Sequence, residues 1–459
     1  MPNTISKEIR QSLNISWKEG IPAAITLGIM DYYLIPYGLF LGATTQEIGF
    51  LIAIPNLLAS IAQLLAVRVV RFSGSRLRFL TKAVYLQAAL LIPVAFLVFF
   101  FFQFRIALLI CFNSLFKIIG NLIATAWGSL MSDYLPDTKR GHYMGWRSQV
   151  VGTASVIGIA LAGLFLFSMS KIDRKLAFFL LFIFASGLRF SSCYLMSKMH
   201  NLPNHPIPGS DFTFIMFLRR FRESNFVKYV LYIASITFAV HLSSPYISVY
   251  MLRHLKFNYL IYMSVHLSAV AAGLISFPIW GKHADVVGNA KILKITSFLI
   301  PVIPLLWMLS KHPVFLMGAE MFSGFVWGGF NLCTANYIYD AVSPAKRVRC
   351  LGYFNLINGI ALCAGASLGG FLAERLPPLW GYRLLSLFLL SAILRFLAHF
   401  LLSKRFKEVR TSAKHITSAQ LFFSVLGIRP ISELDREWAV FPLLHQIPET
   451  IRSSSPETK

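Results

Sequence analysis

Long apolar segments, separated by short polar ones, constrain this chain more than any other feature. Stretches of about twenty mostly apolar residues occur about twelve times, and one such stretch spans the hydrocarbon core of a bilayer as a helix. Helices are favoured there because their backbone N–H and C=O groups are bonded within the segment. We therefore predict an all-α membrane protein. The expected spans are 17–41, 48–67, 77–101, 106–131, 143–167 and 176–196, then 226–252, 259–280, 292–309, 314–339, 351–372 and 384–402.

The composition supports this class and raises a question about charge. Hydrophobic residues make up 56% of the 459 residues, and the mean hydropathy of +0.64 is too high for an ordinary soluble domain. The chain has 43 Lys and Arg against 19 Asp and Glu. This excess of positive charge could serve to bind nucleic acid, to bind anionic lipid, or to set the orientation of the helices in the membrane. The basic residues recur in alternate loops and form no single patch. We therefore expect no nucleic-acid partner and place these loops, with both termini, in the cytoplasm.

Two polar strings in the sequence match each other at a constant offset. SDYLPDTKRGHYMG follows the fourth expected helix, and YDAVSPAKRVRCLG follows the tenth. The matching pairs are Asp133 and Asp340, Arg140 and Arg347, and Gly145 and Gly352, each 207 positions apart. Three glycines of the next helix continue the same offset. This register predicts two homologous six-helix halves in parallel orientation, an arrangement associated with alternating-access transporters.

The predicted layout consists of two six-helix bundles and three cytoplasmic segments. The bundles cover 17–197 and 226–403, and the cytoplasmic segments cover 1–16, 198–225 and 404–459. We expect a multi-pass protein of the plasma (inner) membrane, acting as a monomer. The 5 cysteines lie in or beside apolar runs without CxxC spacing, and no GxxxxGK[ST] motif occurs. We therefore expect no metal, no cofactor and no built-in ATPase.

The chain has twelve expected helices, a central loop and one further motif, and together these resemble the major facilitator superfamily of secondary transporters. The loop after the eighth helix reads GKHADVVGNAK, in which Gly281, Asp285 and Gly288 keep the superfamily's spacing. Asn289 and Ala290 stand where basic residues are expected, and the equivalent loop of the first half lacks the expected Asp. The resemblance covers the expected helices and leaves the C-terminal tail unexplained.

The acids and bases of these loops suggest a conformational role. A short loop that holds both charges can fix neighbouring helix ends in one conformation and release them in another. Asp133 with Arg140, and Asp340 with Arg347, would act in this way after helices four and ten. The alternative is ordinary solvated loop charge, which contributes little to stability. The duplication favours the conformational role.

The resemblance implies that helices one, four, seven and ten line a central cavity. These helices carry four ionisable residues, Asp31, Lys117, His241 and Glu320. Charges at membrane depth cost several kcal/mol unless they are paired or hydrated, so each is a candidate for contact with substrate or protons. Asp31 and Lys117 fall near mid-span, where they can form a pair. A structural ion pair, or a hydrogen-bonded packing role for His241, is the alternative.

Two arginines lie outside this set. Arg189 and Arg395 stand near the expected cytoplasmic ends of helices six and twelve, from which their side chains can reach water.

Three function classes fit these features to different degrees. The leading hypothesis is a secondary transporter that moves a small solute by alternating access, driven by the proton gradient. A receptor or lipid scramblase on the same scaffold is the second, because a fold does not fix a function. A membrane enzyme for lipid-linked substrates is the third, and the 11 scattered histidines disfavour it. We expect no enzyme activity. The sequence does not indicate which solute is moved.

Overall fold

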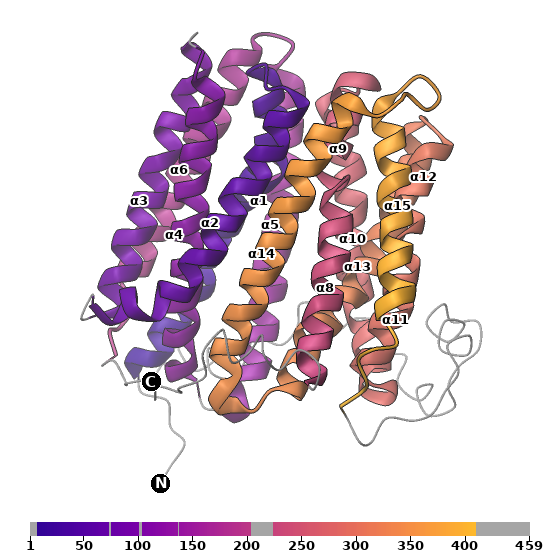
Figure 1. The fold of residues 1–459 in the computed structure, drawn as a ribbon. Helices are drawn as coiled ribbons and strands as arrows, with labels where there is room; N and C mark the ends of the chain where they lie inside the picture. Colours follow the sequence, from indigo (N-terminus) through magenta and orange to yellow (C-terminus); the bar gives the residue numbers. More distant parts are fainter. Residues whose placement is uncertain (1–6, 73–74, 101–102, 136, 203–223, 410–459) are drawn as a thin grey trace, which may run out of the picture. The chain divides into compact units, whose positions relative to one another are not determined.

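The computed structural model describes residues 7–72, 75–100, 103–135, 137–202 and 224–409. Almost all of this part is helical (Figure 1), and an isolated bridge between Leu379 and Tyr382 is its only β pairing. Most of the predicted central loop and of the C-terminal tail lies outside the described residues. The prediction of an all-α fold is confirmed.

The described helices agree in number and length with a polytopic membrane protein. Eleven stretches are long and apolar enough to cross a bilayer. The helix Pro313–Ala341 has 29 residues and also suffices by length. The helices before residue 203 are α1 (Lys7–Phe40), α2 (Thr45–Phe72), α3 (Arg76–Phe96) with the short η1 (Leu97–Phe99), α4 (Arg105–Tyr134), α5 (Asp137–Met169) and α6 (Arg174–Ser197).

The helices after residue 223 include two spans built from shorter pieces. Asn225–His254 crosses as α8, α9 and η2, and Asn289–Leu309 crosses as α11 and α12. A proline lies where each of these spans changes helix, since Pro245 opens α9 and Pro301 precedes α12. The elements are α8 (Asn225–His241), α9 (Ser244–Val249), η2 (Tyr250–His254), α10 (Tyr259–Val287), α11 (Asn289–Leu299), α12 (Val302–Leu309), α13 (Pro313–Ala341), α14 (Pro344–Arg375) and α15 (Arg383–Leu402).

The first helix is longer than its apolar run predicts. α1 begins at Lys7, ten positions before the expected start at Trp17. Its first turns bury Leu13 and Ser16, and the Ser16 hydroxyl is 2.6 Å from the hydroxyl of Tyr143 on α5. The polar beginning of α1 is therefore held by side-chain contacts that hydropathy does not reveal.

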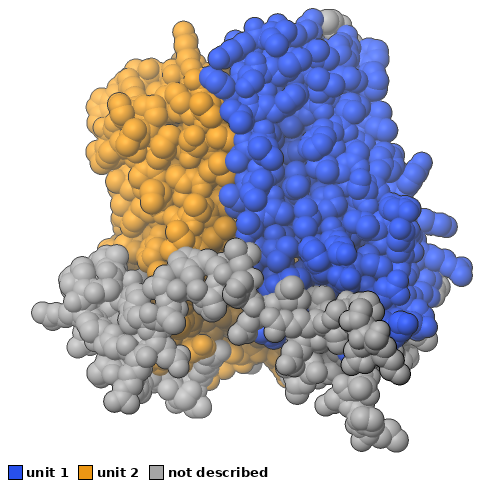
Figure 2. Space-filling model, turned by 180° about the vertical axis from the view of Figure 1, so that it is seen from behind, with its two compact units in different colours: residues 1–37, 61–207, 439–459 blue, residues 38–60, 208–438 orange. Residues whose placement is uncertain are grey.

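The chain divides into two compact units, which Figure 2 shows in different colours. The described parts of 1–37 and 61–207 form the first unit, and those of 38–60 and 208–438 form the second. Within the second unit, the first half of α2 packs on α14, where the backbone of Gly49 lies close to that of Ala366. The division therefore falls in the last turn of α1, inside α2, and between residues 207 and 208.

The sequence repeat is visible in the helix boundaries. α4 ends at Tyr134 and α13 ends at Ala341, 207 positions later. The next helices, α5 and α14, begin at Asp137 and Pro344 with the same offset. The two polar strings therefore form the same helix–turn–helix connection in each half of the chain.

Candidate functional site

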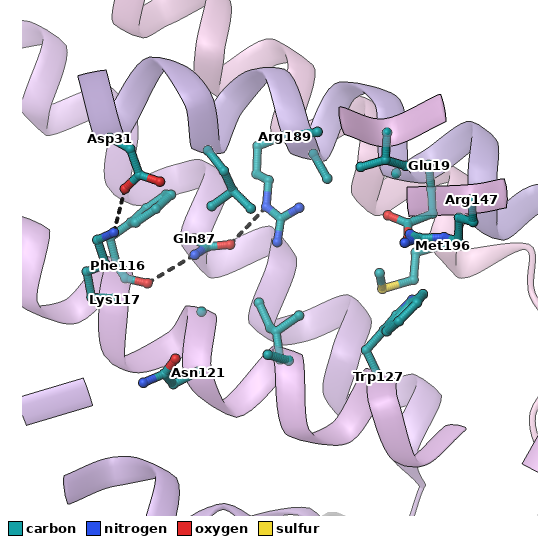
Figure 3. Close-up of a pocket in the computed structure, with 18 residues that line it drawn as sticks. Glu19, Asp31, Gln87, Phe116, Lys117, Asn121, Trp127, Arg147, Arg189 and Met196 are labelled. Atoms are coloured by element: carbon teal, nitrogen blue, oxygen red, sulfur yellow. Dashed lines mark hydrogen bonds and ion pairs between the residues drawn. The ribbon is translucent and has the colours of Figure 1, made fainter. Parts of the chain in front are cut away.

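A cavity of about 410 Å³ lies within the first unit. Its walls come from α1, α3, α4, α5 and α6, as Figure 3 shows in close-up. Most of its lining is apolar. The charged side chains that line it are Glu19 and Asp31 from α1, Lys117 from α4, Arg147 from α5 and Arg189 from α6.

One end of the cavity holds an ion pair between two of the predicted site residues. The Nζ of Lys117 lies 2.6 Å from Oδ1 of Asp31, and the side chains are 29% and 53% exposed. α1 and α4 bring them together from positions 86 residues apart. The structure therefore places a half-exposed ion pair on the cavity wall, among helices that cross the membrane.

The other end holds a charged cluster that the sequence did not single out. Arg147 Nη2 lies 3.2 Å from Oε1 of Glu19, and its guanidinium stands 4.2 Å from the ring centre of Trp127. Arg189 donates through Nη1 to Ser192, which in turn donates to Oε2 of Glu19. Glu19 is therefore tied to two guanidinium groups, one directly and one through a hydroxyl.

Gln87 of α3 joins this cluster to α4. Its Oε1 accepts from Nε of Arg189 at 2.8 Å, and its Nε2 donates to the carbonyl of Phe116 at 3.0 Å (Figure 3). The Gln87 side chain is fully buried. This bridge fixes the orientation of Arg189 toward the cavity.

The sequence prediction for the two arginines of helices six and twelve was wrong. Arg189 and Arg395 are only 4% and 3% exposed, so neither side chain extends out of the helix bundle at a helix end. Arg395 instead donates to Ser243 and Ser391 and to the carbonyls of Val240 and Ile300. Buried acceptors on neighbouring helices explain the difference, because they replace the water that an arginine would otherwise seek.

The remaining predicted cavity residues, His241 and Glu320, belong to the second unit. His241 Nδ1 lies 2.9 Å from the carbonyl of Thr237 on the same helix. Glu320 is 7% exposed and accepts a hydrogen bond of 2.9 Å from Nε1 of Trp307. A carboxyl group with so little water around it needs such a donor.

The duplicated loops share one detailed contact pattern. Nη2 of Arg140 donates to the carbonyls of Ser132 and Leu135, which end α4. Nη2 of Arg347 donates to the carbonyls of Tyr339 and Val342, which end α13. All three positions of each set are offset by 207. Each arginine therefore supplies hydrogen bonds to carbonyls at a helix end, where the helix itself provides no partner.

The acids of these loops contact the preceding helices in different ways. Asp133 forms an ion pair of 2.6 Å with Arg76 at the start of α3. Asp340 accepts a hydrogen bond of 2.7 Å from Asn289 at the start of α11. Each acid thus connects the end of one helix with the beginning of another. The Gly145 and Gly352 positions lie within α5 and α14, in the first turns after the loops.

The motif after the eighth expected helix lies at the end of α10. Gly281 and Asp285 are in its last turns, and Gly288 links it to α11 with a φ of +86°. A side chain at Gly288 would overlap Glu408, whose Oε2 accepts from the backbone N–H of Ala290 at 2.7 Å. A carboxylate at this helix start is favourable, because the first N–H groups lack partners in the helix.

The described residues include no group of three or more His, Cys, Asp or Glu side chains arranged to hold a metal ion. The cavity chemistry therefore consists of ion pairs, guanidinium donors and apolar surface.

The family model of the Major Facilitator Superfamily matches residues 20–312 and 229–444. The chain belongs to this superfamily. The family resemblance seen in the sequence is thereby confirmed. The chain also has the superfamily's many membrane-spanning helices, so it is an integral multi-pass membrane protein and a transporter by family.

Solved transporter structures share this fold at low sequence identity. A bacterial homologue of the human lysosomal transporter Spinster, in an inward-facing and unoccupied conformation, matches with a TM-score of 0.65 and 14% identity, covering 87% of this chain and 98% of the other. The nucleoside transporter NupG matches with 0.62 and 12%, covering 88% and 100%. A bacterial homologue of the iron transporter ferroportin, in an inward-facing state, matches with 0.63 and 14%, covering 87% and 100%. No curated protein sequence matches the chain.

Proposed function

We propose that this superfamily member is a secondary active transporter that moves a small solute by alternating access and couples this movement to protons. The observation that carries the proposal is the Asp31–Lys117 ion pair on the cavity wall. Charges among membrane-spanning helices cost several kcal/mol unless they are paired or hydrated. A pair that stays half exposed and faces a cavity is better suited to binding than to packing.

Asp31 is the proposed proton-binding group. Binding of a proton to its carboxylate would remove the charge that holds Lys117, so that Lys117 becomes free to contact the solute. Loss of the proton would restore the ion pair and expel the solute. His241 and Glu320 are proposed as the polar groups of the second unit that take part in transport.

The duplicated loops are proposed to stabilise one conformation of the transport cycle. Asp133 and Asp340 each join the end of one helix to the start of another, and Arg140 and Arg347 bind the carbonyls at those helix ends. Such contacts can break and re-form as units when helices move. The loop containing Gly281, Asp285 and Gly288 is proposed to act with them.

Transport can be tested without knowing the solute. We would reconstitute the full chain into liposomes that contain a pH-sensitive dye, and add sugars, amino acids, organic anions and amines in turn. Wild type should change the internal pH with at least one compound. Asp31→Asn should lose this change, because an amide cannot bind and release the proton.

Asp173→Asn is the matched control, since Asp173 is an exposed residue that begins α6 and accepts from the N–H groups of Lys175 and Leu176. Asparagine is as favourable as aspartate at the N-cap of a helix, so the variant should fold and proton movement should persist. Solute entry without any change of internal pH would refute the proton coupling. If no added compound enters the liposomes or changes their internal pH, with wild type or with either variant, transport would be refuted.

A further inference from the structure

We propose that the cavity of the first unit takes a small organic monoanion, whose anionic group binds among Arg147, Arg189 and Trp127. This inference rests on the proposed transport function and names its substrate class. The first argument is charge. Three cations and two carboxylates line the cavity, so positive charge exceeds negative charge by at least one in a mostly apolar wall. A monoanion would balance it.

The second argument is an excess of hydrogen-bond donors. Nε1 of Trp127 is buried, and no described residue accepts its hydrogen. Arg147 uses Nε on the carbonyl of Ser16 and Nη2 on Glu19, which leaves Nη1 without an acceptor in the described part of the chain. Arg189 uses Nε and Nη1 but not Nη2 within the same residues. These three donors come from α4, α5 and α6 beside the cavity, and of the three the Trp127 N–H is buried without an acceptor in the described part of the chain.

The side-chain acceptors of the Glu19 cluster are each already engaged by one donor. Oε1 of Glu19 accepts from Arg147, and Oε2 accepts from Ser192. Oε1 of Gln87 accepts from Arg189. A carboxylate or another anionic group from the solute would add further lone pairs beside these donors, and hydrogen bonds between charged groups are the stronger kind.

A cationic solute fits the cavity less well. The one carboxylate open to a ligand is Asp31, and Lys117 already lies 2.6 Å from it. A second ammonium group would have to displace Lys117 or remain close to a like charge. The geometry therefore favours an anion over a cation.

The shape of the cavity indicates an apolar body behind the anionic group. Glu19 and Asp31 are twelve residues apart on α1, so the two charged ends of the cavity are separated by about 18 Å along this helix. Between them the wall is formed by side chains such as Leu27, Phe116 and Ile123. A solute with an apolar body would cover this stretch while its charge remains at the Arg147 end.

A matched set of three compounds tests the charge preference. The full chain, purified in detergent, would be titrated with 3-phenylpropanoate, 3-phenylpropanamide and 3-phenylpropylamine, with thermal unfolding as the readout. These compounds share one body and differ in charge. The acid should raise the unfolding temperature at millimolar concentration, and the amide and amine should bind at least about tenfold more weakly, because charged hydrogen bonds are lost. An equal or larger effect of the amide or amine, or no effect of the acid, would overturn the proposal.

Two variants locate the anionic group. Arg147→Gln should weaken binding of the acid at least about tenfold. Trp127→Phe keeps an aromatic ring but removes the N–H donor, and should weaken it about fivefold. Arg375→Gln is the control, since Arg375 of α14 is exposed and also stacks on an aromatic ring, that of Phe371, but lies outside this cavity. If Arg147→Gln does not fold, Trp127→Phe decides. Unchanged affinity in Trp127→Phe would overturn the assigned position.

The outcome for this inference can be separated from that for transport. Uptake of an amine but not of the acid into liposomes would refute the monoanion and keep the transport function. Tight binding of the acid without any movement across the bilayer would support the site and refute the transport function.

Discussion

At the scale of single residues, the two ends of the cavity differ in how much they depend on their neighbours. The Asp31–Lys117 pair is partly exposed, so water can solvate the two charges in addition to their mutual attraction. The Glu19 cluster is buried, and its charges depend on each other. Removal of one partner of a buried ion pair leaves an uncompensated charge, which costs far more than loss of an exposed pair.

We predict that Glu19→Gln destabilises the protein by about 3 kcal/mol, because Arg147 and Arg189 then lack their counter-charge. Glu320→Gln should cost less than about 1 kcal/mol, since Trp307 can donate equally well to an amide oxygen. Thermal unfolding of both variants in detergent measures this difference. Equal stability of the two variants would show that Glu19 is not needed as a counter-ion.

At the scale of helices, close packing of α10 on α13 depends on small residues. A side chain at Gly324 of α13 would overlap the backbone of Ala269, and one at Gly329 would overlap the ring of Trp280. Such backbone contact is the way in which membrane helices associate, because lipid supplies no hydrophobic force between them. The length of the apolar run predicts that α13 is a helix, but only its neighbour explains where glycine is required.

We predict that Gly324→Ala lowers the stability of the protein by about 2 kcal/mol, since the backbone of α10 must move away from the added methyl group. Gly318→Ala is the internal control, because nothing lies within 4 Å of a side chain at that position of the same helix. It should be neutral or slightly stabilising, as alanine favours helix over glycine. Unfolding temperatures that fall equally in both variants would contradict the packing argument.

At the scale of the whole molecule, the repeat and the distribution of charge describe the same architecture. The helix boundaries around both loops are offset by 207 residues, and basic residues recur in alternate loops. From the positive-inside rule we predict that those loops and both termini lie on the cytoplasmic side of the membrane. On this prediction the net charge of +24 is mainly a topology signal.

Reporter fusions test this topology. Green fluorescent protein joined after Lys459 should fluoresce in bacterial cells, and alkaline phosphatase joined there should be inactive, because each reporter works on only one side of the membrane. Fusions at Ile172, in the connection between α5 and α6, should give the reverse pattern. The same pattern at both positions would refute the predicted orientation.

The sequence by itself determined the fold class, the repeat and the two residues that pair at one end of the candidate site. Apolar length shows which segments cross the bilayer, and a charge in such a segment is visible without coordinates, which is why Asp31 and Lys117 could be found. Only the tertiary structure decided the other end. Glu19, Arg147 and Arg189 lie near expected helix ends, where charge is ordinary in a sequence. Their burial depends on how α1, α5 and α6 pack. Local hydropathy depends only on neighbouring residues in the sequence, so it cannot predict contacts between these helices.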